Sequence, residues 1–176
     1  MRFFETSIQG AYLIEIDRHE DERGFFARVF CRREFSARAL APDFVQQSIS
    51  YNRKRGTLRG LHFQREPKME AKLVRCTRGS IWDVIVDLRS PQSPVSSWHS
   101  EVLSEHNHRM LYVPAGIAHG FQSLEDDTEV LYLMSEYYDA ELADGVRWDD
   151  PVLRIPWPIV PPVAMSERDL SLPWLV

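Results

Sequence analysis

The stretch Ile81-Trp82-Asp83-Val84-Ile85-Val86-Asp87-Leu88 decides the fold class of this chain. Its side chains alternate with a period of two, and successive side chains of an extended strand point to opposite faces of a sheet. One face carries Trp82, Val84, Val86 and Leu88, and the other carries Ile81, Asp83, Ile85 and Asp87. The stretch therefore predicts a β-strand.

Similar short segments recur along the whole chain. Strands are expected at 11–16, 25–30, 44–51, 58–64, 72–78, 98–103, 110–113, 119–124 and 129–136. Helices are expected only at 33–40 and, behind an N-cap at Ser166, near the C-terminus. Many short strands at regular spacing are typical of an all-β sandwich or barrel rather than of βαβ units. The Pro-rich stretch 151–162 predicts an extended segment that wraps over the surface.

Length and composition predict one domain over residues 1–176. The chain is 44% hydrophobic and 27% charged, which is typical of a globular protein. No apolar run approaches the roughly 18 residues of a membrane span, and no apolar segment follows Met1-Arg2, so neither a membrane span nor a signal peptide is expected. Cys31 and Cys76 make no disulfide framework and favour a reducing cytoplasm.

The charge balance argues against a nucleic-acid-binding protein. The chain has 21 Lys and Arg against 26 Asp and Glu, a net charge of −5, whereas nucleic-acid binding favours a basic face. The cluster at 53–55 fits a solvated loop. Arg59 lies beside an apolar run and is the better candidate for a bidentate phosphate contact.

His62 and Lys72 are the first candidates for chemistry. Polar or turn-forming residues at 65–71 separate their strands, so a hairpin that makes them cross-strand neighbours is predicted. Lys72 shares a face with Val74 and is expected to point inward, where an ammonium is costly unless its charge is used. Taken alone, His62 fits a hydrogen-bonded core histidine equally well. If Arg59 serves the same pocket, a bulge at Gly60 must re-aim one of the two side chains.

The sequence Pro114-Ala115-Gly116-Ile117-Ala118-His119 resembles the second half of the cupin motif, in which a small jelly-roll β-barrel presents a metal-binding histidine. Gln64 stands where the first half of that motif has its second histidine. Three protein ligands are therefore hard to assemble, and a cupin-like barrel without a metal is expected. On the residues alone, Tyr132 fits an aromatic at the barrel mouth and Asp169 fits a helix N-terminal carboxylate.

Together, these segments resemble the dTDP-4-dehydrorhamnose 3,5-epimerase family, the sugar-nucleotide cupins, from about Arg2 to Asp169. The stretches that carry the resemblance are Asp21-Glu22-Arg23-Gly24-Phe25-Phe26, Leu58-Arg59-Gly60-Leu61-His62-Phe63-Gln64, Lys72-Leu73-Val74-Arg75-Cys76, Pro114 to Phe121, and the Tyr132 strand with Tyr137-Tyr138. The resemblance implies a cofactor-independent isomerase of nucleotide-sugar metabolism, with a place in dTDP-rhamnose and O-antigen biosynthesis.

The resemblance also implies residue roles. His62 matches the catalytic base, Asp169 the carboxylate that orients it, Tyr132 the acid on the opposite face of the sugar, and Lys72 the residue that stabilises the enolate oxygen. The substrate-binding positions it implies are Arg23, Phe26, Gln46, Arg59, His119, Tyr138 and Arg168, with Arg59 near the diphosphate. Arg23 would reach the site of a neighbouring subunit through a swapped N-terminal segment, which implies a homodimer.

These residue types suit the implied chemistry. A ketone at C4 of a hexose acidifies the protons on C3 and C5, and an imidazole can remove one near neutral pH. A fixed ammonium stabilises the enolate oxyanion, and a phenol can return a proton to the other face. Neither a metal nor a nicotinamide is expected, and no Gly-rich dinucleotide loop is present in the sequence.

Departures from the family pattern fall on recognition positions. Arg28 and Ala143 stand where the family usually has glutamates, and Arg168 where it has a lysine. The usual Val-Gln-Asp-Asn-His-Ser reads Val-Gln-Gln-Ser-Ile-Ser at 45–50, and the loop before Arg59 is longer. A different nucleotide base, a different 4-keto sugar or epimerisation at C3 alone would each account for such changes.

The leading hypothesis is an epimerase of a nucleotide-linked 4-keto-6-deoxyhexose that acts through an enolate. A 3,4-ketoisomerase is a second enzymatic interpretation, because related barrels move carbonyls with similar histidine bases. A non-catalytic sugar-nucleotide-binding cupin is a third, and a metal-dependent cupin oxygenase is the least favoured. Product NMR separates the first two, because the carbonyl stays at C4 in one and migrates to C3 in the other.

Overall fold

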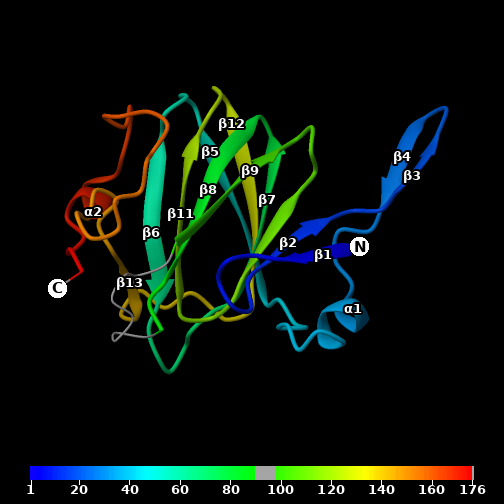
Figure 1. Cartoon of the computed structure of the whole chain (residues 1–176), viewed down its shortest axis with the longest axis horizontal. Helices are drawn as coiled ribbons and strands as arrows, with labels where there is room; N and C mark the ends of the chain where they lie inside the picture. Colours follow the sequence, from blue (N-terminus) through cyan, green and yellow to red (C-terminus); the bar gives the residue numbers. More distant parts are fainter. Residues whose placement is uncertain (90–97, 176) are drawn as a thin grey trace.

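Two antiparallel β-sheets face each other in the computed structural model, which describes residues 1–89 and 98–175 (Figure 1). The first sheet has six strands in the order β1-β2-β10-β7-β12-β5, with bounds Arg2–Glu5 (β1), Tyr12–Glu15 (β2), Met110–Val113 (β10), Lys72–Arg78 (β7), Thr128–Met134 (β12) and Gln46–Asn52 (β5). The second has five strands in the order β13-β6-β11-β8-β9, with bounds Ala143–Gly145 (β13), Leu58–Gln64 (β6), Ile117–Ser123 (β11), Ser80–Asp87 (β8) and Trp98–Ser104 (β9).

One hairpin and two short helices lie outside the two sheets. The hairpin pairs β3 (Arg18–Asp21) with β4 (Gly24–Ala27), and the helices are α1 (Arg32–Ser36) and α2 (Glu167–Leu170). The architecture is the all-β, cupin-type jelly roll with a few short helices that the sequence predicts. Within residues 1–89 and 98–175, no helix combines the length and the apolar character that crossing a membrane requires.

The alternation of apolar and polar residues does not predict the strands that bury little surface. The strands β1, β3 and β13 are not predicted; β3 exposes all of its residues, and β13 is very short. The helix expected at 33–40 ends at Ser36. The next turn is tighter, with the N–H groups of Arg38 and Ala39 bonded three residues back, and the chain then leaves the helical direction at Ala39 (φ 56°). The C-terminal helix is confirmed, and the Ser166 side chain accepts a hydrogen bond from the backbone N–H of Asp169.

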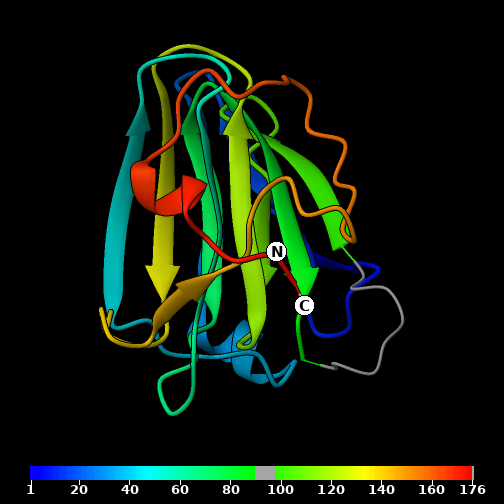
Figure 2. The ribbon, with the colours of Figure 1, turned by 90° about the vertical axis from the view of Figure 1, so that its left-hand side faces the viewer.

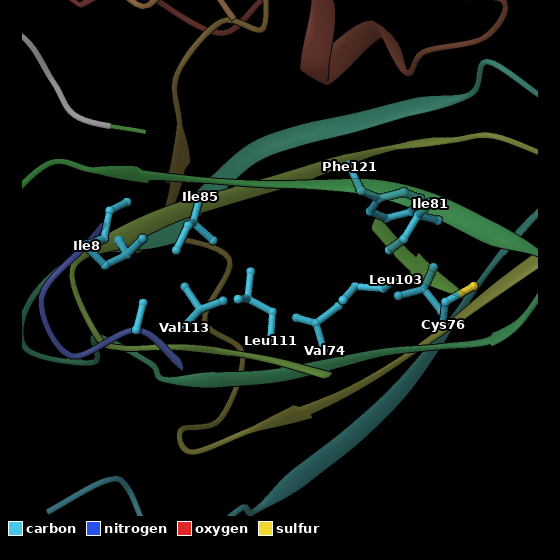
Figure 3. Packing of buried hydrophobic residues seen from close by; sticks show 12 residues of the cluster. Ile8, Val74, Cys76, Ile81, Ile85, Leu103, Leu111, Val113 and Phe121 are labelled. Carbon is cyan, nitrogen blue, oxygen red and sulfur yellow. The ribbon is translucent and has the colours of Figure 1, made fainter. Parts of the chain in front are cut away.

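Apolar side chains from both sheets meet in a buried cluster between them (Figure 3). Val74 on β7 and Leu111 on β10 lie in this cluster together with Ile85 on β8. The alternation predicted for β8 is confirmed, because Val84 and Val86 lie in a second cluster on the opposite face of the strand. Each large aliphatic side chain buried in this way contributes about 1.5–3 kcal/mol.

The Pro-rich stretch covers the outer face of the five-stranded sheet (Figure 2). Leu153, Ile155 and Trp157 pack there in one cluster with Leu58 and Val84. This confirms the extended wrap predicted for 151–162, and it places the segment that follows, including α2, beside β6.

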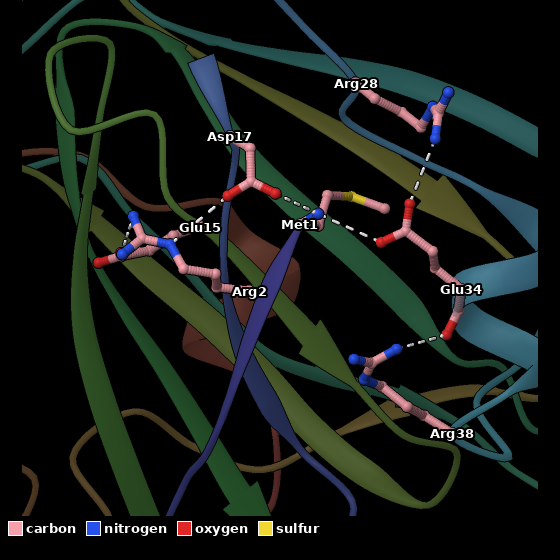
Figure 4. A network of polar contacts seen from close by, with 7 residues as sticks. All are labelled: Met1, Arg2, Glu15, Asp17, Arg28, Glu34 and Arg38. Carbon is pink, nitrogen blue, oxygen red and sulfur yellow. Dashed lines mark hydrogen bonds and ion pairs between the residues drawn. The ribbon is translucent and has the colours of Figure 1, made fainter. Parts of the chain in front are cut away.

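A polar network fixes the N-terminus to α1 (Figure 4). The Met1 ammonium contacts Asp17 at 2.7 Å and Glu34 at 3.2 Å, and Arg28 contacts the same Glu34 carboxylate at 3.4 Å. On its other side, α1 buries Phe35 against the six-stranded sheet. The burial of Phe35 contributes more to holding the helix in place than these ion pairs do, because exposed ion pairs add little to the free energy of folding.

The β3–β4 hairpin projects from the sheets on the side of the molecule opposite α2 (Figure 1). Phe26 is 76% exposed and Phe25 is 42% exposed. Arg23 forms an ion pair with Asp21 of the same hairpin at 2.6 Å. The hairpin therefore presents a guanidinium and two phenyl rings outside the subunit that carries them.

A bulge between β6 and β11 sets the direction of two predicted site residues. His62 pairs with His119 and Arg59 pairs with Phe121, so Gly60 and Leu61 together oppose the single residue Gly120. Gly60 takes a φ of 134°, which favours glycine. This confirms the bulge expected at Gly60, and it lets Arg59 and His62 line one cavity.

We expect Gly120→Ala to lower the free energy of unfolding by about 1–3 kcal/mol, as overpacked sites typically do. A Cβ at Gly120 would lie 2.8 Å from the backbone oxygen of Arg59 and 3.0 Å from the Cα of Gly60, neither of which can move without disturbing the bulge. Urea unfolding followed by tryptophan fluorescence measures the change. An unaltered unfolding midpoint would contradict this close approach of β6 and β11.

Candidate active site

A cavity of about 290 Å³ lies between β6 and β11 of one sheet and β5, β7 and β12 of the other. Seven of the residues predicted for the site line it: Arg59, His62, Lys72, His119, Tyr132, Tyr138 and Arg168. Asp169 lies behind His62 at hydrogen-bond distance. The fold thus brings together residues that are up to about a hundred positions apart in the sequence.

His62 and Asp169 form a hydrogen-bonded pair. His62 Nε2 donates to Asp169 Oδ1 at 2.7 Å. The other carboxylate oxygen accepts from the backbone N–H of Gly60 at 3.3 Å, and the N-cap at Ser166 fixes the turn that carries Asp169. This arrangement fixes the plane of the imidazole and leaves Nδ1 as the ring nitrogen that can take a proton.

The charge of Asp169 is stabilised where it lies. Burial opposes ionisation of this carboxyl, but the hydrogen bond and charge of His62 and the N–H of Gly60 hold its pKa below the ordinary value. Asp169 is therefore ionised at neutral pH and can stabilise an imidazolium on His62.

Lys72 reaches the cavity from the facing sheet, so the hairpin predicted between β6 and β7 is wrong. The segment 65–71 carries the chain from one sheet to the other. Lys72 points inward as expected. Its Nζ donates to the backbone oxygen of His62 at 3.2 Å and forms an ion pair with Glu70 Oε1 at 3.1 Å. The predicted proximity of His62 and Lys72 is real, but it arises across the interior rather than within one sheet.

His119 is paired with Asp83, a carboxylate that the sequence did not predict to be part of the site. Its Nε2 lies 2.8 Å from Asp83 Oδ2, and both side chains are buried. Burial raises the pKa of Asp83, although His119 and Lys72 oppose that shift. The signal in the sequence is the position of Asp83 between Ile81 and Ile85 on the inward face of β8, because an inward carboxyl in an apolar strand needs a partner.

Tyr132 faces the same cavity from β12. Its ring meets the His119 ring edge-on, with centroids 5.7 Å apart. Burial, followed by the charge of Asp83, raises the pKa of the Tyr132 phenol well above 10. The phenol therefore holds its proton at neutral pH, as a proton donor must.

Cationic side chains border the cavity. Arg59 donates from Nε to Asn52 Oδ1 at 2.8 Å, and Arg168 donates to the backbone oxygen of Ala143 at 3.1 Å. Within residues 1–89 and 98–175, the hydrogen bonds of both guanidinium groups go to neutral oxygen atoms, and none goes to a carboxylate. Unpaired guanidinium groups at a cavity rim suit an anionic ligand such as a diphosphate.

Two glutamine side chains hold the loop of Tyr138. Gln46 Oε1 accepts the backbone N–H of Tyr138 at 2.6 Å, and Gln64 bonds the backbone of Tyr137 and Asp139. Gln46 does not line the cavity. Gln64 occupies the position of the missing cupin histidine, and no group of three His, Cys, Asp or Glu side chains gathers in a metal-binding arrangement in residues 1–89 and 98–175.

Arg23 and Phe26 do not line the cavity of their own chain. Both lie on the projecting β3–β4 hairpin, with Arg23 held by Asp21 and Phe26 exposed. Ser48 and Ser50, from the stretch 45–50 that the sequence places among the recognition positions, also line the cavity, whereas Glu70 and Asp144 line it without having been predicted. Isolated polar residues that belong to no sequence motif cannot be assigned to a cavity from the sequence. Their position becomes clear only from the three-dimensional structure.

Comparison with known proteins gives a consistent result. The family model described as dTDP-4-dehydrorhamnose 3,5-epimerase matches residues 5–176. The dTDP-4-dehydrorhamnose 3,5-epimerase of Sinorhizobium fredii is 42% identical over 175 residues, covering 99% of this chain and 90% of that protein. The enzyme of the same name from Methanothermobacter thermautotrophicus is 44% identical over 170 residues, covering 96% and 91%.

Two solved structures also resemble this chain closely in fold. The dTDP-4-dehydrorhamnose 3,5-epimerase of Bacillus anthracis, crystallised with TDP and PPi bound, superposes with a TM-score of 0.94 at 42% identity and 99% coverage of both chains. A 3'-monoepimerase from Streptomyces bikiniensis superposes with a TM-score of 0.88 at 31% identity, covering 96% of this chain and 85% of that one.

We expect Asp169→Asn to lower the free energy of unfolding at pH 7 but to matter less in acid. The pKa of Asp169 lies below its ordinary value in the folded protein, so its ionised form stabilises the fold above about pH 4. That contribution is lost as the pH falls through the folded-state pKa. Urea unfolding of both proteins from pH 7 down to about pH 3 measures the difference, and a pH-independent difference would contradict the assigned charge.

Proposed function

The chain belongs to the dTDP-4-dehydrorhamnose 3,5-epimerase family, and from this premise we propose how its cavity performs the reaction. The protein is an isomerase that epimerises a nucleotide-linked 4-keto-6-deoxyhexose by removing and returning protons through an enolate. We propose that the substrate is dTDP-4-dehydro-6-deoxyglucose and that both C3 and C5 are inverted. The names of the two relatives at 42% and 44% identity support this choice.

His62 starts the reaction as the base. Its Nδ1 takes the proton from C3, the C–H electron pair forms the C3=C4 double bond, and the carbonyl electron pair moves onto the C4 oxygen. Asp169, 2.7 Å from Nε2, stabilises the imidazolium that results. The Lys72 ammonium donates a hydrogen bond to the enolate oxygen, which carries more negative charge than the ketone did.

Tyr132 completes the inversion as the acid. It gives its phenolic proton to C3 from the opposite face of the ring, and the electron pairs return to restore the C4 ketone. Proton exchange with water then restores the imidazole and the phenol. The same sequence at C5 completes the double epimerisation.

One observation carries this proposal: His62 and Tyr132 face one cavity from opposite sheets. A planar enolate held between β6 and β12 would present one face to the imidazole and the other to the phenol. Arg59 and Arg168 at the rim would hold the diphosphate, and Tyr138, which is largely exposed at the rim, would stack on the nucleoside.

We also propose a homodimer with exchanged β3–β4 hairpins. The hairpin leaves its own sheets and exposes Phe26, and Arg23 lies outside the cavity of its own chain. In a dimer, these side chains would close the nucleotide end of the neighbouring cavity. Gln46 supports the same end, because it holds the Tyr138 backbone. A cytoplasmic location fits the free thiols of Cys31 and Cys76.

We expect His62→Ala and Tyr132→Phe to fail in different ways. Loss of the base should lower both the exchange of substrate hydrogen with heavy water and the formation of epimerised product by about 10²–10⁴-fold. Tyr132→Phe should lower product formation to a similar degree yet leave His62 able to exchange the C3 hydrogen without inversion. NMR of the sugar nucleotide in heavy water measures both rates, and a fully active His62→Ala would reject the mechanism.

We expect mixed dimers to show whether the hairpin acts between subunits. Arg23→Ala and His62→Ala homodimers should each be nearly inactive. In a re-equilibrated equal mixture, half of the dimers are mixed, and each of these has one cavity with an intact His62 and an intact hairpin. About a quarter of wild-type activity should therefore return. An unchanged, low activity in a mixture shown to contain mixed dimers would place the hairpin in its own subunit's site.

A further inference from the structure

A second carboxylate faces the cavity, and the mechanism above gives it no task. Glu70 lies two residues before Lys72, the first residue of β7, and its side chain is only 12% exposed. Glu70 Oε1 is 3.1 Å from Lys72 Nζ, and the Lys72 side chain is 10% exposed. A carboxylate this well buried beside the position of a developing anion needs a reason, because it repels that anion.

The contacts of Lys72 supply the reason. An ammonium has three N–H donors. One donates to the backbone oxygen of His62 on β6 at 3.2 Å, and the ammonium also forms an ion pair with Glu70 Oε1 at 3.1 Å. These two contacts hold the ammonium of a flexible lysine side chain in one place in the cavity, where its remaining N–H groups can reach a ligand.

The backbone around Glu70 is itself held. The N–H of Ala71 donates to Ser135 Oγ at 2.8 Å, and the N–H of Ser135 donates to the backbone oxygen of Ala71 at 3.0 Å. These bonds join the segment before β7 to the end of β12. Glu70 therefore extends from a fixed point, and its carboxylate can define where the ammonium lies.

We propose that Glu70 is a positioning residue that aims the Lys72 ammonium at the enolate oxygen. This inference rests on the proposed function, because it assigns to Glu70 a task in the reaction assigned to the cavity. Glu70 acts through Lys72 and transfers no proton. A side-chain oxygen at its position is what the task requires, whether it belongs to a carboxylate or to an amide.

The test compares Glu70→Gln, which keeps an acceptor oxygen, with Glu70→Ala and Glu70→Met, which remove it. Methionine keeps the side-chain volume if the alanine variant does not fold. We expect kcat for epimerisation to fall on the order of tenfold to a hundredfold in the Ala and Met variants, within the loss that follows removal of an oxyanion donor. KM should change less than threefold, and the Gln variant should keep at least a third of the wild-type kcat.

A double-variant comparison separates positioning from a general structural role. If Glu70 works only through Lys72, adding Glu70→Met to Lys72→Met should lower kcat no further. Glu66→Gln is the matched control, because Glu66 is an exposed carboxylate of the same segment outside this cavity. It should behave as wild type, and thermal unfolding of every variant checks that the fold is retained.

Three results would overturn the inference while leaving the proposed function intact. They are wild-type kcat in the Met variant, equal losses in the Gln and Met variants, and a further loss when Glu70→Met is added to Lys72→Met. Failure of the proposed function itself looks different, because the wild-type protein would then not epimerise the keto sugar nucleotide.

Discussion

The 2.7 Å hydrogen bond between His62 Nε2 and Asp169 Oδ1 is the interaction on which the geometry of the active site depends. It joins β6 to a short C-terminal helix more than a hundred residues away in the sequence. The extended segment 151–162 makes this possible, because its packing on the outer face of the five-stranded sheet delivers the chain to α2 beside β6. Without that wrap, an aspartate so late in the chain would have no fixed relation to His62, and the imidazole would be free to rotate.

The cavity divides opposite chemical tasks between the two sheets. The five-stranded sheet supplies an imidazole backed by an ionised carboxylate, which makes it a base. The six-stranded sheet supplies a phenol whose pKa burial keeps well above 10, which makes it a neutral acid. Lys72 also comes from the six-stranded sheet but contacts the backbone of His62, so the ammonium lies between the two. An enzyme that moves hydrogen between the two faces of a ring needs this separation, because a single group can serve only one face.

The sequence predicts the jelly roll well and the cavity in part, for physical reasons. The alternation at 81–88 and the cap at Ser166 are local, and both are confirmed. The pairing of β6 with β7 is wrong, because a turn-rich segment such as 65–71 can join neighbours in one sheet or cross between sheets, and local pattern does not distinguish these. Asp83 is missed because its partner, His119, lies on another strand, and Glu70 is missed because its role depends on the inward turn of Lys72 two residues later. The roles of His62, Tyr132 and Asp169 come from family resemblance, and the geometry supports them without testing them.

The fate of the C3 hydrogen tests the two-sided mechanism most directly. Substrate carrying deuterium at C3 would be converted in a single turnover in ordinary water, and the product would be analysed by NMR. If His62 removes hydrogen on one face and Tyr132 supplies it on the other, the epimerised product carries no deuterium at C3. Product that retains the label would show that one group carries the same hydrogen around the ring, and it would contradict a mechanism with separate groups on the two faces.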